Sequence, residues 1–209
     1  MTEPDADTLS PLALSILELL DERPMHPYEM SSTMRIRHQD EFIRLNFGTL
    51  YHTVDVLERN GWIVSGEREK EGRRPERTIY KLTDAGSQVL SRTLGELLRK
   101  PMREYPHFVA GLMFMHHLGA TEAAGHLNER ASLLDAQVTK FEHVLDELHK
   151  QGLSRLALIE MEHKIAMLDA ERKWVRHLSL EITDGTLEWK VGIHSDPEAL
   201  GRTHGTGAH

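Results

Sequence analysis

Six residues between positions 46 and 53 have the chemistry to contact a nucleic acid: Asn46, Gly48, Thr49, Tyr51, His52 and Thr53. Threonine hydroxyls can hydrogen-bond to base edges, and threonine methyl groups can touch the methyl group of thymine. Unpaired N–H groups at the start of a helix favour a nearby phosphate. These residue types therefore predict a helix whose leading end faces DNA, with Thr49 and Thr53 toward the bases. Tyr51 has two interpretations, a phenol that reaches a phosphate or a ring that packs on a neighbouring element.

Arg73 and Arg74 form a second group that could contact DNA. They lie in a run from Glu71 to Glu76 that contains Gly and Pro and is typical of a turn. The surrounding residues 59–81 include seven basic and four acidic ones, whereas the whole chain has a formal net charge of −8. A local positive segment is what phosphate contact needs. We predict that both arginines contact the DNA backbone or the minor groove; the alternative is an ordinary solvated hairpin tip.

A helix with one apolar face must position the first group. Asn46 can cap its start by accepting a hydrogen bond from an unpaired backbone N–H. Leu50, Val54 and Leu57 recur at i, i+4 and i+7, which places them on one face. Gly61 can end the helix, because glycine readily takes the left-handed conformation. We expect this helix to be the recognition helix of a DNA-binding domain.

The segments around this helix complete a domain. Alternating residues at 62–66 and 78–82 predict two strands on either side of the arginine turn. Thr83 can cap a following helix that extends to about residue 99, and Ser10 and Pro27 can begin two helices upstream. The order helix, helix, helix, hairpin, helix predicts a winged helix-turn-helix DNA-binding domain over residues 9–100. Residues 1–8 are expected to be a disordered lead-in.

The C-terminal half contains two apolar seams. After a hinge at 100–106 and a short apolar helix at 108–118, we expect a long helix capped by Thr121. Its apolar residues recur at alternating steps of four and three, and a second run after Gly152 is interrupted by Arg172 and Ser179. The positions predicted to mediate dimerisation are Leu127, Leu134, Val138, Phe141, Leu145, Leu148, Leu158, Ile165 and Leu168.

The seams predict an antiparallel helical, coiled-coil dimerisation domain over residues 107–190, followed by a disordered tail at 195–209. The alternative is a helical hairpin that closes within one chain. The predicted fold class is thus mainly α with a small β-hairpin wing. Two joined heads would place recognition helices in successive major grooves about 34–36 Å apart and would read an inverted repeat.

Four segments resemble the PadR family of bacterial transcriptional regulators. They are residues 25–30 (Met-His-Pro-Tyr-Glu-Met), 48–51 (Gly-Thr-Leu-Tyr), 57–63 (Leu-Glu-Arg-Asn-Gly-Trp-Ile) and 77–86 (Arg-Thr-Ile-Tyr-Lys-Leu-Thr-Asp-Ala-Gly). The resemblance implies a homodimer that binds double-stranded DNA, is usually a repressor, and often releases DNA when a small-molecule effector binds. The C-terminal half looks like that of the long-tailed branch. Pro27 and His52 depart from the family pattern, which has Gly and Pro there.

Other classes of protein are not indicated. The chain has no cysteine, and its 14 histidines include no His-Glu-x-x-His motif, so no metal site or cofactor is predicted. It has no phosphate-binding glycine loop and no nucleophile elbow, so no enzyme is predicted. The N-terminus does not resemble a signal peptide and no apolar run could span a bilayer, which predicts a cytoplasmic location and no membrane partner. The acidic net charge leaves one alternative, a winged-helix protein-interaction module without DNA binding.

Overall fold

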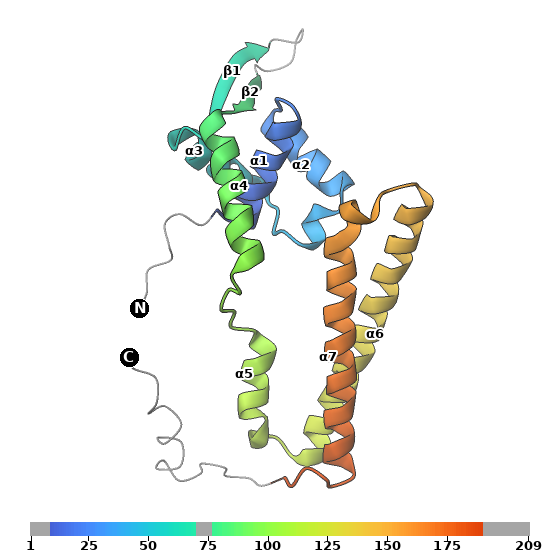
Figure 1. Cartoon of the computed structure of the whole chain (residues 1–209). Helices are drawn as coiled ribbons and strands as arrows, with labels where there is room; N and C mark the ends of the chain where they lie inside the picture. Colours follow the sequence, from blue (N-terminus) through green and yellow to red (C-terminus); the bar gives the residue numbers. More distant parts are fainter. Residues whose placement is uncertain (1–8, 70–76, 190–209) are drawn as a thin grey trace, which may run out of the picture. The chain divides into compact units, whose positions relative to one another are not determined.

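The computed structural model describes residues 9–69 and 77–189 (Figure 1). The predicted lead-in at 1–8, the tail at 195–209, and Arg73 and Arg74 in the wing lie outside these residues. The chain divides into two compact units, Met1–Arg103 and Glu104–His209. We call them the head and the C-terminal unit.

The described part of the head has its helices and strands in the order that the sequence predicts. They are α1 (Pro11–Glu22), α2 (Pro27–Ile36), the 3-10 turn η1 (Gln39–Glu41), α3 (Phe47–Arg59), β1 (Ile63–Glu69), β2 (Arg77–Leu82) and α4 (Asp84–Arg99). This order confirms the winged helix-turn-helix prediction, with α3 as the recognition helix and the β1–β2 hairpin as the wing. Helix α2 ends before His38, where the backbone takes a left-handed conformation with φ of 57°.

Side-chain caps begin the helices at the predicted places. Each cap accepts a hydrogen bond from a first-turn N–H: Ser10 from Ala13 at 3.2 Å, Asn46 from Thr49 at 2.8 Å and Thr83 from Gly86 at 3.1 Å. The cap of α2 was not predicted, since histidine is not a usual capping residue. There, Nδ1 of His26 accepts from the Tyr28 N–H at 3.0 Å. Pro27, one of the two departures from the family pattern, is the first residue of α2, where a missing N–H is tolerated.

One apolar core holds the head together. It draws fully buried side chains from α1, α2, α3 and β1, among them Ile16, Leu17, Leu19, Met30, Met34, Leu50, Val54, Leu57 and Ile63. All three apolar positions predicted for α3 are in this core. Their burial confirms the orientation of α3, because the residues on its opposite face must then point away from the core.

The wing is a two-stranded antiparallel sheet with a bulge. Ile63 lies opposite Leu82, and Ser65 lies opposite Tyr80. Beyond Ser65, β1 has one residue more than β2, and Gly66 lies in this bulge. A Cβ at Gly66 would lie 3.3 Å from a backbone carbonyl oxygen of β2, which favours a glycine in this position.

A backbone bridge attaches the wing to the loop between α1 and α2. The Met25 N–H donates to the Tyr80 carbonyl at 3.1 Å, and the Tyr80 N–H donates to the Met25 carbonyl at 3.0 Å. The Met25 side chain is buried in the head core. The base of the wing is therefore fixed to the rest of the head by both hydrogen bonds and packing.

Gly86 lets α4 start directly against the end of α3 and the wing. A Cβ at this position would lie 2.0 Å from the carbonyl oxygen of Trp62 and 2.6 Å from Cδ1 of Leu82. The same carbonyl accepts a hydrogen bond from the N–H of Thr83 at 3.1 Å, and the Thr83 hydroxyl is shared between this carbonyl at 3.0 Å and that of Gly61 at 2.7 Å. The close approach requires glycine, because every other residue has a Cβ.

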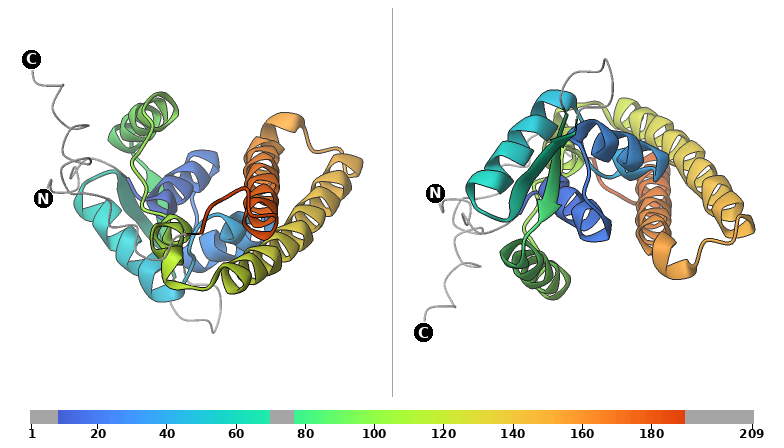
Figure 2. Two further views of the ribbon diagram at one scale, coloured as in Figure 1. Left: turned by 90° about the horizontal axis from the view of Figure 1, so that it is seen from below. Right: turned by 90° about the horizontal axis from the view of Figure 1, so that it is seen from above.

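The C-terminal unit is helical throughout its described part. Its elements are α5 (His107–Phe114), η2 (Met115–His117), α6 (Ala120–Lys150), η3 (Arg155–Leu158) and α7 (Ile159–Thr183). Helices α6 and α7 run side by side and antiparallel (Figure 2). The chain reverses direction at Gly152, whose φ of 89° is in the left-handed region.

The start of α6 differs from the prediction. Gly119, not Thr121, is the residue before the helix, and it makes no side-chain cap. The Gly119 carbonyl already accepts the first helical hydrogen bond, from the Ala123 N–H at 2.9 Å. Thr121 therefore lies inside the first turn, because the helical hydrogen bonds begin two residues earlier than its capping chemistry suggested.

The apolar seam predicted for dimerisation joins α6 to α7 of the same chain. The buried seam residues are Leu127, Leu134, Val138, Phe141, Leu158 and Leu168, while Leu145, Leu148 and Ile165 pack at the edge of one of the cores between the two helices. These side chains therefore pack within one chain, as in the helical hairpin that the sequence left as the alternative. Dimerisation stays a prediction, and it needs a surface other than this seam.

The two polar interruptions of the seam make specific contacts across the hairpin. Nη1 of Arg172 donates to the Asp135 carboxylate on α6 at 2.9 Å. The Ser179 hydroxyl, which is buried, donates to the Ala124 carbonyl at 3.2 Å. Polar residues at these positions therefore link α6 and α7 and do not leave gaps in the packing.

Candidate nucleic-acid interface

The leading end of α3 is open to a ligand. Asn46, Gly48 and Thr49 are all exposed. The side-chain oxygen of Asn46 accepts the Thr49 N–H, so Asn46 positions the first turn. Among the described residues, only that oxygen would lie within 4 Å of a Cβ built on Gly48, at 3.7 Å. A phosphate or a base edge could thus approach the backbone closely at the positive end of the helix.

His52 and Thr53, one turn further along, differ in how freely they could contact a base. His52 is exposed, and it lies one helical turn after Gly48 on the same face. Thr53 is half-buried, and its hydroxyl donates to the Thr49 carbonyl at 2.7 Å. A base contact by Thr53 would therefore use its methyl group or the lone pairs of its oxygen, whereas Thr49 and His52 present their side chains directly.

Tyr51 is half-exposed and lies near enough to Tyr80 of the wing to interact with it electrostatically. Burial of Tyr80 on β2 raises the pKa of that phenol, and the nearby Glu58, Asp55 and Tyr51 raise it further. Glu58 also accepts a hydrogen bond from the Ser65 N–H of β1 at 3.1 Å. Glu58 therefore joins α3 to the wing.

Three exposed residues beside α3 were missed by the sequence reading. Phe47, the first residue of α3, stacks on Tyr28 of α2 with ring centroids 6.4 Å apart and an interplanar angle of 10°. The guanidinium carbon of Arg35 lies 5.4 Å from the centroid of the Phe47 ring. We call Tyr28, Arg35 and Phe47 the aromatic cluster. The positions of Phe47 and Pro27-Tyr28 at the starts of two helices were visible in the sequence, but their proximity depends on how α2 packs on α3.

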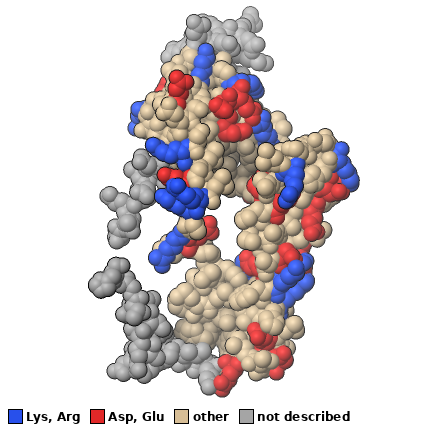
Figure 3. Space-filling view, viewed as in Figure 1, with Lys and Arg blue, Asp and Glu red and all other residues tan. Residues whose placement is uncertain are grey.

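Charge on the face drawn in Figure 3 is mixed. Lys and Arg are interspersed with Asp and Glu on the face drawn in Figure 3, and basic side chains gather along α4 and just after it. A mixed distribution agrees with the net charge of −8 for the whole chain. Binding of a polyanion would therefore rely on local groups and not on one uniformly basic face.

Helix α5 has an apolar face that the other described residues leave exposed. None of its eight residues is buried, although its sequence is mainly apolar. Met113 and Phe114 are 64% and 58% exposed, and Val109 is about half exposed. Phe108 and Leu112, on the other side of the helix, pack against the core formed by α6 and α7. The outer face of α5 is thus an apolar surface of the kind that marks a protein contact.

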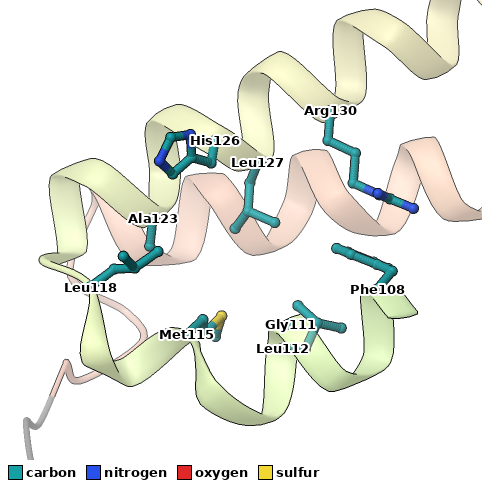
Figure 4. A pocket seen from close by; sticks show the side chains of 9 residues that line it. All are labelled: Phe108, Gly111, Leu112, Met115, Leu118, Ala123, His126, Leu127 and Arg130. Carbon is teal, nitrogen blue, oxygen red and sulfur yellow. The ribbon is translucent and has the colours of Figure 1, made fainter. Parts of the chain in front are cut away.

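A pocket with a volume of about 230 Å³ lies inside the C-terminal unit, between α5 and α6 (Figure 4). Its lining is mainly apolar and includes Phe108, Leu112, Met115, Leu118, Leu127 and Arg130. The guanidinium carbon of Arg130 lies 3.7 Å from the centroid of the Phe108 ring at one end of the pocket. Arg130 also donates from Nε to Glu171 at 2.7 Å, so its charge is largely balanced.

Neither a metal site nor a membrane span is found in the ranges 9–69 and 77–189. Within them, no three His, Asp or Glu side chains are grouped closely enough to hold a metal ion. No helix in this part of the chain is long and apolar enough to cross a bilayer.

The geometry of the head defines the class of protein. A helix-turn-helix with an exposed recognition helix, followed by a hairpin that is fixed to the same core, is a winged helix-turn-helix domain. Residues 16–92 match the model of the transcriptional regulator PadR-like family. The match to this family model covers most of the head, which confirms the resemblance seen in the sequence. Proteins of this family are transcriptional regulators and not enzymes. No curated protein sequence matches the chain significantly.

Solved structures of PadR proteins share the fold. PadR of Bacillus subtilis in complex with operator DNA is 18% identical with a TM-score of 0.67, covering 83% of this chain and 99% of that chain. The same protein in complex with p-coumaric acid is 17% identical with a TM-score of 0.69, covering 82% and 98%. A PadR-like regulator of Bacillus cereus is 17% identical with a TM-score of 0.57, covering 83% and 99%.

Proposed function

We propose that this protein is a sequence-specific DNA-binding transcriptional regulator, a repressor that binds an inverted-repeat operator as a homodimer. The observation on which this proposal depends is the leading end of α3. It is exposed, capped by Asn46, and backed by the buried face of Leu50, Val54 and Leu57. The match to a family of transcriptional regulators supports the same role. Such a role requires access to DNA, in agreement with the cytoplasmic location predicted from the sequence.

The first experiment measures binding of the full chain to the DNA upstream of its own gene, by gel shift and footprinting. Protection of two half-sites about one helical turn apart supports the proposal. Thr49→Ala should change which half-site sequence is preferred, because Thr49 faces the bases. Replacement of Arg73 and Arg74 by Ala should weaken binding to all sequences and reduce the salt slope, because phosphate contacts are independent of sequence.

The proposed homodimer needs a surface outside the α6–α7 seam, and the outer face of α5 fits this need. Met113→Glu should place a charge in that contact and convert the dimer to a monomer in analytical ultracentrifugation. Leu156→Glu is the matched control, because Leu156 is strongly exposed but lies on η3, away from α5. If Met113→Glu remains dimeric, α5 is not the dimer contact.

A small-molecule effector is the remaining part of the proposal, and the pocket between α5 and α6 could hold it. A cavity of about 150 Å³ holds a benzene ring, so a volume of about 230 Å³ fits a substituted single ring. One solved PadR structure contains p-coumaric acid, which is therefore a reasonable probe. Gly111 lines the pocket, and a Cβ there would meet no atom within 4 Å.

Calorimetry should detect binding of p-coumaric acid, or of another compound from a single-ring panel, to the wild-type chain. Gly111→Leu should abolish binding by filling the pocket. Gly111→Ala should preserve binding while making the same change in helix propensity. Equal binding by both variants would exclude this pocket as the effector site. A reporter gene that is silenced by the protein and released by the same compound would establish repression.

A protein-interaction module without DNA binding is the second candidate, favoured by the net charge of −8 and the mixed surface charge. The gel shift distinguishes the two functions. Absence of any shift at low salt, with a folded protein, would support the interaction module.

A further inference from the structure

The aromatic cluster of Tyr28, Arg35 and Phe47 has no role in the core of the head. Tyr28 is 59% exposed and Phe47 is 44% exposed. Neither ring belongs to the head core formed by the described residues. Two adjacent aromatic rings open to water are unfavourable unless a partner covers them. Burial among residues 9–69 and 77–189 therefore does not explain why a phenylalanine occupies the first position of the recognition helix.

The place of the cluster indicates which partner would cover it. Phe47 follows the capping Asn46 and immediately precedes Gly48 and Thr49, the residues at the leading end of α3. The exposed Phe47 ring therefore belongs to the same leading end of α3 as the first-turn N–H groups and the Thr49 side chain. In a winged helix-turn-helix domain, the N-terminal residues of the recognition helix meet base edges in the major groove.

The chemistry of the cluster narrows the contact further. The phenyl ring of Phe47 cannot form the hydrogen bonds with a base edge that a threonine hydroxyl can form. Apolar side chains do, however, contact the thymine methyl group in the major groove. Tyr28 supports the Phe47 ring by stacking on it, which limits the positions that the ring can take. The exposed Arg35 lies near the same ring with its guanidinium free of any ion pair among the described residues.

We propose that Phe47 contacts the methyl group of a thymine in each half-site, while Arg35 contacts a neighbouring phosphate and Tyr28 holds the ring in place. This inference rests on the proposed DNA binding and adds to it a residue that selects sequence. Phe47 would read the methyl group and not a hydrogen-bonding pattern. The preferred half-site should therefore contain a thymine that cannot be replaced by uracil without loss of affinity.

The experiment compares operators in which single thymines are replaced by deoxyuridine, which lacks only the methyl group. Each half-site should contain one thymine that contacts Phe47. When deoxyuridine replaces this thymine in one half-site, we expect the wild-type protein to bind about fourfold more weakly, because one buried group of the size of a methylene is lost. Phe47→Ala should bind both operators equally, and Phe47→Leu should keep part of the discrimination. Arg35→Gln should retain the discrimination but lower the salt slope by about two, as expected for one lost phosphate contact in each half-site.

Leu98→Ala is the control, because Leu98 is an almost fully exposed apolar residue on α4, outside the cluster. It should bind both operators as the wild type does. If the wild type binds the operator and Phe47→Ala retains the full sensitivity to deoxyuridine, the inference is overturned while the proposed function stands. If the wild type binds no DNA, the proposed function itself fails, and the cluster becomes a candidate contact for a protein. Circular dichroism of each variant separates loss of contact from loss of folding.

Discussion

Gly86→Ala should destabilise the head strongly, although alanine is the better helix former. A Cβ at this position would lie 2.0 Å from the carbonyl oxygen of Trp62, whereas ordinary van der Waals contact begins at 3.4 Å. The carbonyl cannot simply turn away, because it accepts a hydrogen bond from the backbone N–H of Thr83. The first turn of α4 would have to move by more than an ångström from the base of the wing.

The expected change in the free energy of unfolding is the sum of two opposing effects. Inserting a methyl group into a well-packed site costs about 1–3 kcal/mol, and a rigid backbone neighbour places this case at the upper end. Alanine recovers up to about 1 kcal/mol through its helix propensity. We therefore expect the free energy of unfolding of the head to fall by about 2 kcal/mol. Gly95→Ala, in the same helix, is the matched control. A Cβ at Gly95 meets no atom within 4 Å, so this variant should gain up to about 1 kcal/mol.

Urea unfolding followed by tryptophan fluorescence measures both variants. In a background with Trp174→Phe and Trp189→Phe, the remaining Trp62 reports on the head, beside the altered contact. The reasoning is refuted if Gly86→Ala unfolds at the same urea concentration as the wild type or at a higher one. A destabilised Gly95→Ala would equally show that helix propensity has been misjudged in α4.

Three further predictions concern single contacts. Asn46→Ala should lower head stability by about 1 kcal/mol through loss of the cap and should weaken DNA binding. Asn46→Asp should preserve stability, because aspartate also caps helices. Equal urea midpoints for the two variants would contradict the role of Asn46 as a cap. Ser179→Ala should destabilise the C-terminal unit by about 1 kcal/mol through loss of the hydrogen bond to Ala124, and an unchanged midpoint would show that the bond contributes nothing. The hydrogen bond with Lys173 lowers the pKa of Asp169. The ionised carboxylate therefore stabilises the folded state at pH values above the ordinary pKa of aspartate. This stabilisation is lost as the pH falls through the lowered pKa of the folded state. Lys173→Gln should weaken that acid sensitivity in pH-dependent thermal melts, and identical melts would exclude the pair as a source of it.

Much of the head could be predicted from the sequence because its signals are local. Caps such as Asn46 and Thr83 act within one turn, and the i, i+4, i+7 spacing of Leu50, Val54 and Leu57 determines which face of α3 is buried. The aromatic cluster could not be found in this way, since its members come from two helices and meet only after packing. Interactions of this kind depend on the crossing of α2 and α3, which a one-dimensional pattern does not specify.

The C-terminal unit shows a different limit. The heptad spacing correctly indicated seam-forming helices, but the spacing is the same whether the partner helix comes from another chain or from the same one. The short loop at Gly152 makes the intrachain partner available at high local concentration, and α7 fills the seam. In the described part of the C-terminal unit, the outer face of α5 is an apolar surface that this hairpin leaves exposed.

The polar contacts across the α6–α7 hairpin have a consequence for how the two helices align. A heptad seam alone permits sliding, because a shift of seven residues, about 10 Å along the axis, matches apolar positions again. Such a shift would separate Arg172 from Asp135 and Arg130 from Glu171. These pairs therefore favour the observed register of α6 against α7, in addition to the limit that the short loop at Gly152 sets.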